Sequence, residues 1–233
     1  MSAGRQTYPT SVAGKHPFSF GRDYDFHELL ADGIVHGIGV VFALVGGTAL
    51  IFYASVYAGR PEQLAVWIYS IGLIASLAIS FTYNMLPHSR LKWYFRRLDH
   101  SAIFILIAAT YTPFLLRGTD DSWLMGLLVM IWVMAAFGIA IKCLFPGRYD
   151  RLAILLYLLM GWSGVVTFKS LSTVLPPTTM MLIVLGGLIY STGVIFHVWE
   201  KLRFQNAIWH TFVVVAAVVH YSAVLSAFRQ LSP

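Results

Sequence analysis

The sequence predicts an all-α integral membrane protein, a seven-transmembrane helix bundle. The first observation is a shortage of charge: 11% of the 233 residues are charged and 58% are apolar, against roughly 25% and 45–50% in average globular chains. The second is that the uncharged residues form seven runs of 17 to 30 residues, and a transmembrane helix needs about 17–25. The third is the uneven distribution of Lys and Arg between these runs.

These runs exclude several other classes of protein. A soluble globular domain and a disordered chain do not carry them, and a disulfide scaffold is excluded because Cys143 is the only cysteine. A membrane β-barrel alternates in polarity over strands of about ten residues instead. The net charge of +6 must then lie in loops, where it reports orientation in the membrane, and we expect no nucleic-acid partner.

The charged residues that bound each run give the expected spans in chain order: 34–57, 64–86, 101–116, 123–144, 152–168, 178–198 and 207–228. We expect no cleaved signal peptide, because the residues before the first span lack an apolar stretch of about 7–15 residues. The third span is the shortest and contains Pro113, whose missing backbone bond neighbouring helices can replace. Trp and Tyr mark several of the other span ends, as at a membrane interface.

The loop charges predict the orientation. Lys and Arg number 12 in the N-terminal segment and the loops after spans two, four and six, against 4 on the opposite side. Short cytoplasmic loops carry the excess of Lys and Arg, so we expect a cytoplasmic N-terminus and a C-terminus outside. Residues 1–24 are expected to form a cytoplasmic tail, and residues 25–233 the seven-helix domain.

Polar side chains inside the spans are costly in a membrane and are candidates for function. They gather toward the cytoplasmic ends of five spans, as His36, Ser80, Asn84, Asp99, His197, Asn206 and His210. Three sets repeat every four residues, which places their members on one helix face; these sets are Glu28–Asp32–His36, Ser80–Asn84 and Asn206–His210. The pattern predicts a polar site that faces the cytoplasm, without naming a substrate.

Four segments carry a resemblance to a known family: ELLADGIVHGIG, SFTYNMLPHS, RRLDHSAIFILIAATYTPF and NAIWHTFVVVAAVVHY. Over about residues 25–228 the chain resembles the hemolysin III family of bacterial membrane proteins, which is related to the progestin and adipoQ (adiponectin) receptors. The resemblance implies seven helices in the bacterial inner membrane, action on the membrane or its lipids, and a zinc site near the cytoplasmic side.

The implied site has a His at the end of span two, two His four residues apart in span seven, an Asp that acts through a bound water, and an accompanying Ser. Ser80 matches the Ser and Asp99 the Asp, which makes these two the catalytic candidates, and His210 matches the second His of span seven. Asn84 and Asn206 occupy the other two ligand positions, and an amide suits zinc less well than imidazole. Asp32 stands where the family usually has Asn.

Three explanations of this departure stay open. In the first, the zinc site is lost and the polar residues form a metal-free hydrogen-bonded cluster. In the second, His210 still binds a metal with substitute ligands, His197 or His36 among them, and a His210–His197–Asp99 set is considered. In the third, a weakly bound or different metal lies among Asn, Asp and His. Zinc is therefore a doubtful cofactor in this chain.

The leading expectation for function is a membrane protein that acts on or senses the membrane and its lipids, with membrane lipids as partners. One alternative is a metal-dependent hydrolase of lipid amides, similar to the ceramidases. Another is a cytolytic, pore-associated protein. The last fits poorly, because uniformly apolar spans insert as they are made, whereas a secreted toxin must first be soluble.

Overall fold

The computed structural model describes residues 24–145 and 148–228. Those residues form eight α-helices joined by short loops and two short 3-10 turns. The helices are α1 (Phe26–Tyr57), α2 (Arg60–Met85), α3 (Arg90–Leu115), α4 (Ser122–Leu144), α5 (Asp150–Trp162), α6 (Phe168–Val174), α7 (Pro177–Val198) and α8 (Gln205–Phe228). Within the described ranges seven helical segments are long and apolar enough to cross a membrane, which confirms the predicted seven-helix bundle.

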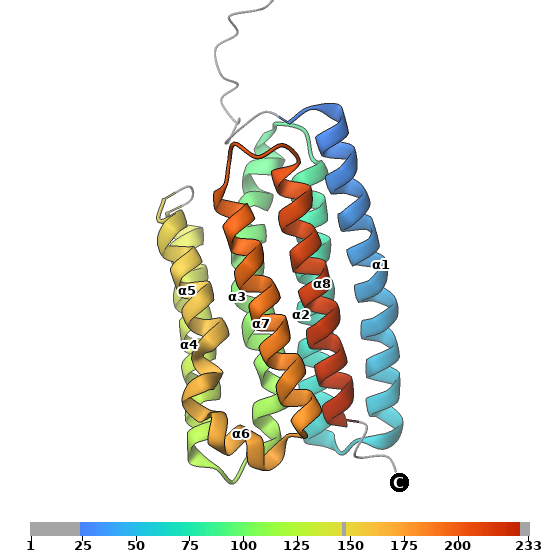
Figure 1. Cartoon of the computed structure of the whole chain (residues 1–233), viewed down its shortest axis with the longest axis vertical. Coiled ribbons are helices and arrows are strands. Elements are labelled where there is room, and N and C mark those ends of the chain that lie inside the picture. The colour runs from blue at the N-terminus through green and yellow to red at the C-terminus, as the bar shows by residue number, and fades with distance from the viewer. Residues whose placement is uncertain (1–23, 146–147, 229–233) are drawn as a thin grey trace, which may run out of the picture.

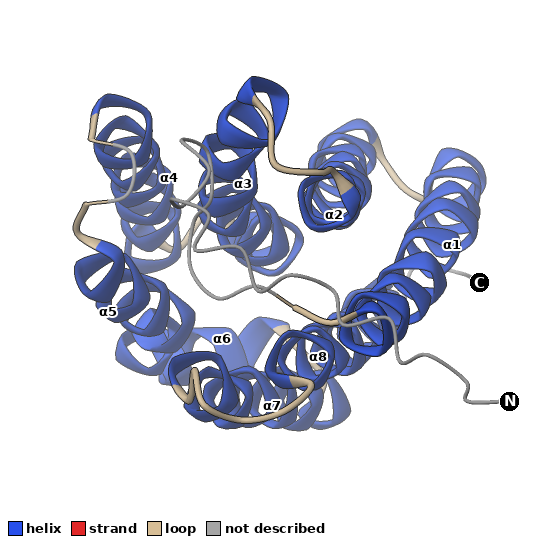
Figure 2. Ribbon diagram, turned by 90° about the horizontal axis from the view of Figure 1, so that it is seen from above, coloured by secondary structure: helices blue, strands red, loops and turns tan. Residues whose placement is uncertain are grey.

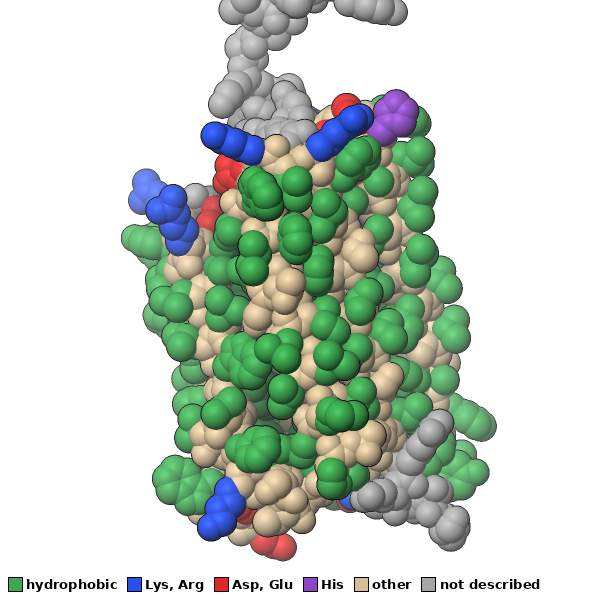
Figure 3. Space-filling model, in the orientation of Figure 1, with side chains coloured by type: hydrophobic (Ala, Val, Ile, Leu, Met, Phe, Trp, Pro, Cys, Tyr) green, Lys and Arg blue, Asp and Glu red, His purple; other side chains and the backbone are tan. Residues whose placement is uncertain are grey.

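The helices stand side by side around the bundle (Figure 1). Helices α1 to α4 follow one another along one side, α5, α7 and α8 return along the other, and α8 packs against both α7 and α1 (Figure 2). Helices α1 and α8 both begin at the top of the bundle in Figure 1. This end is called the amino-terminal end below. On the face drawn in Figure 3, charged side chains lie near both ends and hydrophobic ones cover the middle.

Several helices begin before the expected spans, because the uncharged runs report the hydrocarbon part of a helix and not its ends. Helix α3 begins at Arg90, where the side chain of Ser89 accepts a hydrogen bond from the backbone N–H of Lys92 at 3.2 Å. The basic residues that were counted in the loop after span two therefore lie in the first turns of α3. Most of the predicted tail, residues 1–23, lies outside the described residues.

The fifth span differs from the single run expected at 152–168. Helix α5 ends at Trp162, a 3-10 turn covers Ser163–Thr167, and α6 continues to Val174. The hydroxyl of Tyr111 bridges this break: it donates to the carbonyl oxygen of Gly161 at 2.7 Å and accepts from the N–H of Gly164 at 3.0 Å. Because irregular backbone at membrane depth needs such partners, Tyr111 makes the interruption tolerable.

Close packing between helices depends on small residues. A Cβ atom built on Gly138 of α4 would lie 2.3 Å from the ring of Phe104, and one built on Gly186 of α7 would lie 2.1 Å from the ring of His220. The glycines thus let aromatic rings lie directly against a neighbouring backbone, as is common where membrane helices cross closely.

Candidate functional site

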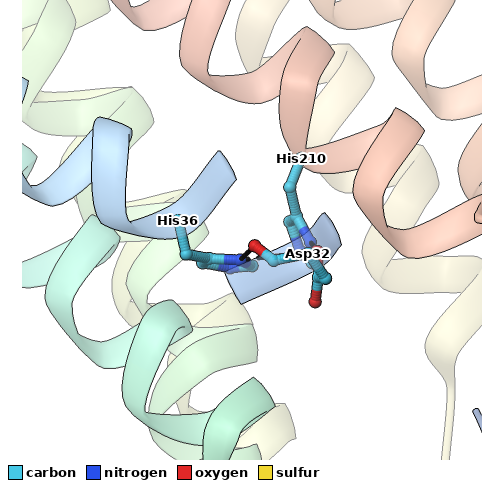
Figure 4. Close-up of side chains that lie close together, drawn as sticks. All are labelled: Asp32, His36 and His210. Carbon is cyan, nitrogen blue, oxygen red and sulfur yellow. Dashed lines mark hydrogen bonds and ion pairs between the residues drawn. The ribbon is translucent and has the colours of Figure 1, made fainter. Parts of the chain in front are cut away.

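Three ligand-type side chains meet at the amino-terminal end of the bundle. Asp32 and His36 project from one face of α1, and His210 projects from α8 (Figure 4). The first two residues are 1% and 3% exposed, and the side chain of His210 is 12% exposed. In the part of the chain that the structure describes, this is the one group of three or more His, Cys, Asp or Glu side chains placed to hold a metal ion, with ligand atoms within 4.8 Å of one another.

Asp32 orients both imidazoles. Its carboxylate oxygen Oδ1 lies 2.6 Å from Nδ1 of His210, and its backbone carbonyl oxygen lies 2.9 Å from Nδ1 of His36. The two ring centroids are 4.1 Å apart. Since both oxygens only accept hydrogen bonds, Nδ1 of each ring is the donor.

Helix α2 brings two of the predicted residues to this group. The Oγ atom of Ser80 lies 3.2 Å from Nε2 of His36. The side-chain amide of Asn84 donates to the backbone oxygen of Ser80 at 2.9 Å and lies 3.5 Å from the same Nε2. Ser80 and Asn84 therefore border His36, and His36 itself becomes a central member of the site.

Asn206 and Glu28 serve a different contact, between the start of α1 and the start of α8. The hydroxyl of Tyr24 donates to Oδ1 of Asn206 at 3.1 Å. Glu28, 4% exposed, accepts from the N–H of Phe204 at 3.0 Å and from that of Asp25 at 3.1 Å. Asp25 caps α1 in return, and its hydrogen bond from the backbone N–H of Glu28 lowers the pKa of the Asp25 carboxyl, so the cap stays charged at neutral pH.

Replacing Glu28 with alanine is expected to destabilise the protein by about 1–3 kcal/mol, because the N–H of Phe204 loses a charged acceptor. Glu28→Gln keeps one acceptor oxygen and should cost less. Thermal unfolding of the detergent-solubilised protein measures both. Equal unfolding temperatures for Glu28→Ala and the unchanged chain would show that this contact does not hold α1 to the loop before α8.

Two other predicted residues lie apart from the three-residue group. The carboxylate of Asp99 is 3.7 Å from Nδ1 of the adjacent His100. The ring of His197 packs against Trp209, with centroids 4.9 Å apart. The structure thus brings His36 to His210, and it places neither His197 nor Asp99 in a common ligand set with it.

The donors at the implied zinc positions do not fit the metal. The side-chain amides of Asn84 and Asn206 already form hydrogen bonds with Ser80 and Tyr24. Of the three implied imidazole ligands, only that of His210 is present. Zinc prefers imidazole, thiolate and carboxylate ligands. The set of Asp32, His36 and His210 supplies two imidazoles and a carboxylate, which fits a transition metal. From the sequence, His36 was a candidate substitute ligand beside His210, but nothing in the sequence placed Asp32 next to the His210 ring.

A second feature is an apolar cavity toward the other end of the bundle. It encloses about 60 Å³, and its lining includes Tyr111, Phe114, Trp162, Phe168, Met180 and His220. The broken fifth span forms one wall, where Nε1 of Trp162 donates to Oγ of Ser191 on α7 at 3.0 Å. The hydroxyl of Tyr111 is occupied by the backbone of the break, so the cavity offers mainly hydrocarbon and aromatic surface.

Comparison with known proteins gives consistent matches. A family model described as Haemolysin-III related matches residues 24–221. The chain is 35% identical to a hemolysin-3 homolog of Bacillus subtilis (strain 168), over 87% of this chain and 95% of that protein. It is 36% identical to hemolysin-3 of Bacillus cereus, over 85% and 90% of the two chains. It is 31% identical to the monocyte to macrophage differentiation factor of Homo sapiens, over 85% and 83%. No solved structure matches the chain.

Proposed function

Because the chain belongs to the haemolysin-III related family and is a multi-pass integral membrane protein, we propose that it senses membrane lipids by binding an acyl chain within the bundle. It would do so in the bacterial inner membrane, with its N-terminus in the cytoplasm. The observation that carries the proposal is the apolar cavity beside the broken fifth span.

The lining of the cavity favours hydrocarbon over a charged headgroup. Phe114, Phe168 and Met180 present apolar surface, and Trp162 presents an aromatic ring. The 3-10 turn at Ser163–Thr167 interrupts the helix at the wall, and irregular backbone at membrane depth is found where it is buried in protein or lines a cavity.

The test uses the full chain in detergent and a radiolabelled sixteen-carbon fatty acid. Gly187→Leu should weaken binding of the fatty acid about tenfold, because a Cβ at Gly187 points toward the Trp162 ring at 3.6 Å and a leucine there occupies the cavity. Gly126→Leu is the matched control: no described atom lies within 4 Å of a Cβ at this exposed position of α4. Equal binding by both variants would contradict the proposal.

A second candidate, hydrolysis of a lipid amide, is favoured by one observation. Asp99 lies twelve residues before Tyr111 on α3, about 18 Å along the helix, so an acyl chain in the cavity leaves its headgroup near the polar end. Hydrolysis of a fluorescent ceramide, abolished by Asp99→Asn, would support this candidate. Bound lipid that is released unchanged would support sensing instead.

A further inference from the structure

We propose that Asp32, His36 and His210 bind a zinc ion, in a ligand set built from α1 and α8. This set differs from the one that the family resemblance implies, since His210 is the one residue common to both. The proposal is independent of lipid binding, because the three residues lie at the amino-terminal end of the bundle and do not line the cavity.

The buried carboxylate of Asp32 needs a positive charge nearby. Its side chain is 2% exposed, and its ion-pair partners among the described residues are the two imidazoles. The basic side chain of Lys92 is directed elsewhere, with Nζ donating to the backbone oxygen of Leu86 at 2.8 Å. An unpaired charge at this depth costs several kcal/mol. Either a proton on an imidazole or a bound cation must offset it.

The orientation of the imidazoles favours the cation. Nδ1 of His210 lies 2.6 Å, and Nδ1 of His36 lies 3.4 Å, from the same carboxylate oxygen of Asp32. A divalent ion that displaced the protons between these atoms would be bound by all three side chains.

The spacing is close to that of a metal site. Zinc binds nitrogen and oxygen at about 2.0–2.2 Å, so the donors of a tetrahedral site lie about 3.4 Å apart. The donors here lie within 4.8 Å of one another. A contraction of at most about 1.4 Å would close the set around an ion, which rotation of the side chains can supply.

The ligand types indicate which metal ions can bind. Two imidazoles and one carboxylate suit zinc and the neighbouring divalent transition metals, whereas magnesium and calcium prefer oxygen ligands. Three protein ligands leave a fourth position for water. The hydroxyl of Ser80, 3.2 Å from Nε2 of His36, gives that side of the site a polar wall.

The test is the metal content of the purified full chain after exposure to zinc and desalting. Elemental analysis should find about one zinc per chain. Asp32→Asn, His36→Gln and His210→Gln should each weaken zinc binding at least about tenfold. Cobalt in place of zinc should give the visible absorption of a tetrahedral ion, and this spectrum should change in His36→Gln.

Two variants serve as matched controls. His197→Gln and Asp99→Asn alter a His and an Asp at the same end of the bundle, outside the three-residue set, and should keep the zinc. Circular dichroism and size-exclusion elution identify variants that remain folded, and the cobalt spectrum of the unchanged chain tests the site without any variant. A zinc-loaded chain that retains less than about a tenth of an ion, or folded variants of the three residues that retain it fully, would overturn the proposal.

Discussion

Replacing Gly138 with alanine is expected to destabilise the bundle by about 1–2 kcal/mol. The added Cβ would lie 2.3–2.6 Å from three atoms of the Phe104 ring. That ring is fully buried and packs against the ring of Tyr157, with centroids 4.5 Å apart, so it cannot retreat. Overpacking costs about 1–3 kcal/mol, whereas the better helix propensity of alanine returns about 1 kcal/mol. The steric cost therefore exceeds the gain.

Gly126→Ala is the control on the same helix. No described atom lies within 4 Å of a Cβ at Gly126, so the gain in helix propensity acts alone. Its unfolding temperature should match or slightly exceed that of the unchanged chain, while that of Gly138→Ala falls. The measurement is the thermal unfolding temperature of each variant in detergent. Similar shifts of that temperature in Gly126→Ala and Gly138→Ala would refute the packing argument.

The double variant Asn84→His with Asn206→His is expected to gain a zinc site that no longer depends on Asp32. Asn84 already lies 3.5 Å from the ring of His36, and Asn206 lies one helical turn before His210 on α8, where residues four apart share a face. Two new imidazoles would then join His210. Three imidazoles hold zinc well, whereas amides do not.

The measurement is the zinc content of the double variant in the Asp32→Asn background. We expect about one zinc per chain there, against little in Asp32→Asn alone. The two single variants are the controls, and each should restore less than the pair does. A folded triple variant without zinc would show that positions 84 and 206 do not face the same ion.

The sequence predicted the fold well, and its errors have a physical source. Each of the seven expected spans coincides, to within one residue at its ends, with part of a helical segment that could cross a membrane. The start of α3 was placed too late, at 101 instead of Arg90, because charge marks where a helix leaves the hydrocarbon layer and not where it ends. The break at Ser163–Thr167 was missed because it depends on Tyr111, a partner about 50 residues away.

The site was predictable only in part. Spacing alone placed Asp32 and His36 on one face of a helix, and it placed Ser80 with Asn84. It could not show which face of α1 meets α8, since that depends on packing of the whole ring. The contact between Asp32 and His210, 178 residues apart, is therefore the part of the site that only the structure reveals.

That separation has a consequence for biosynthesis. At roughly 5–20 residues per second, about 9–36 s pass between the synthesis of Asp32 and that of His210. During this interval α1 is made without α8, and a membrane-inserted Asp32 has His36, on the same helix, as its available partner. The site can form only when the last helix arrives, so a chain truncated before α8 would leave a carboxylate in the membrane without the partner that completes its neutralisation.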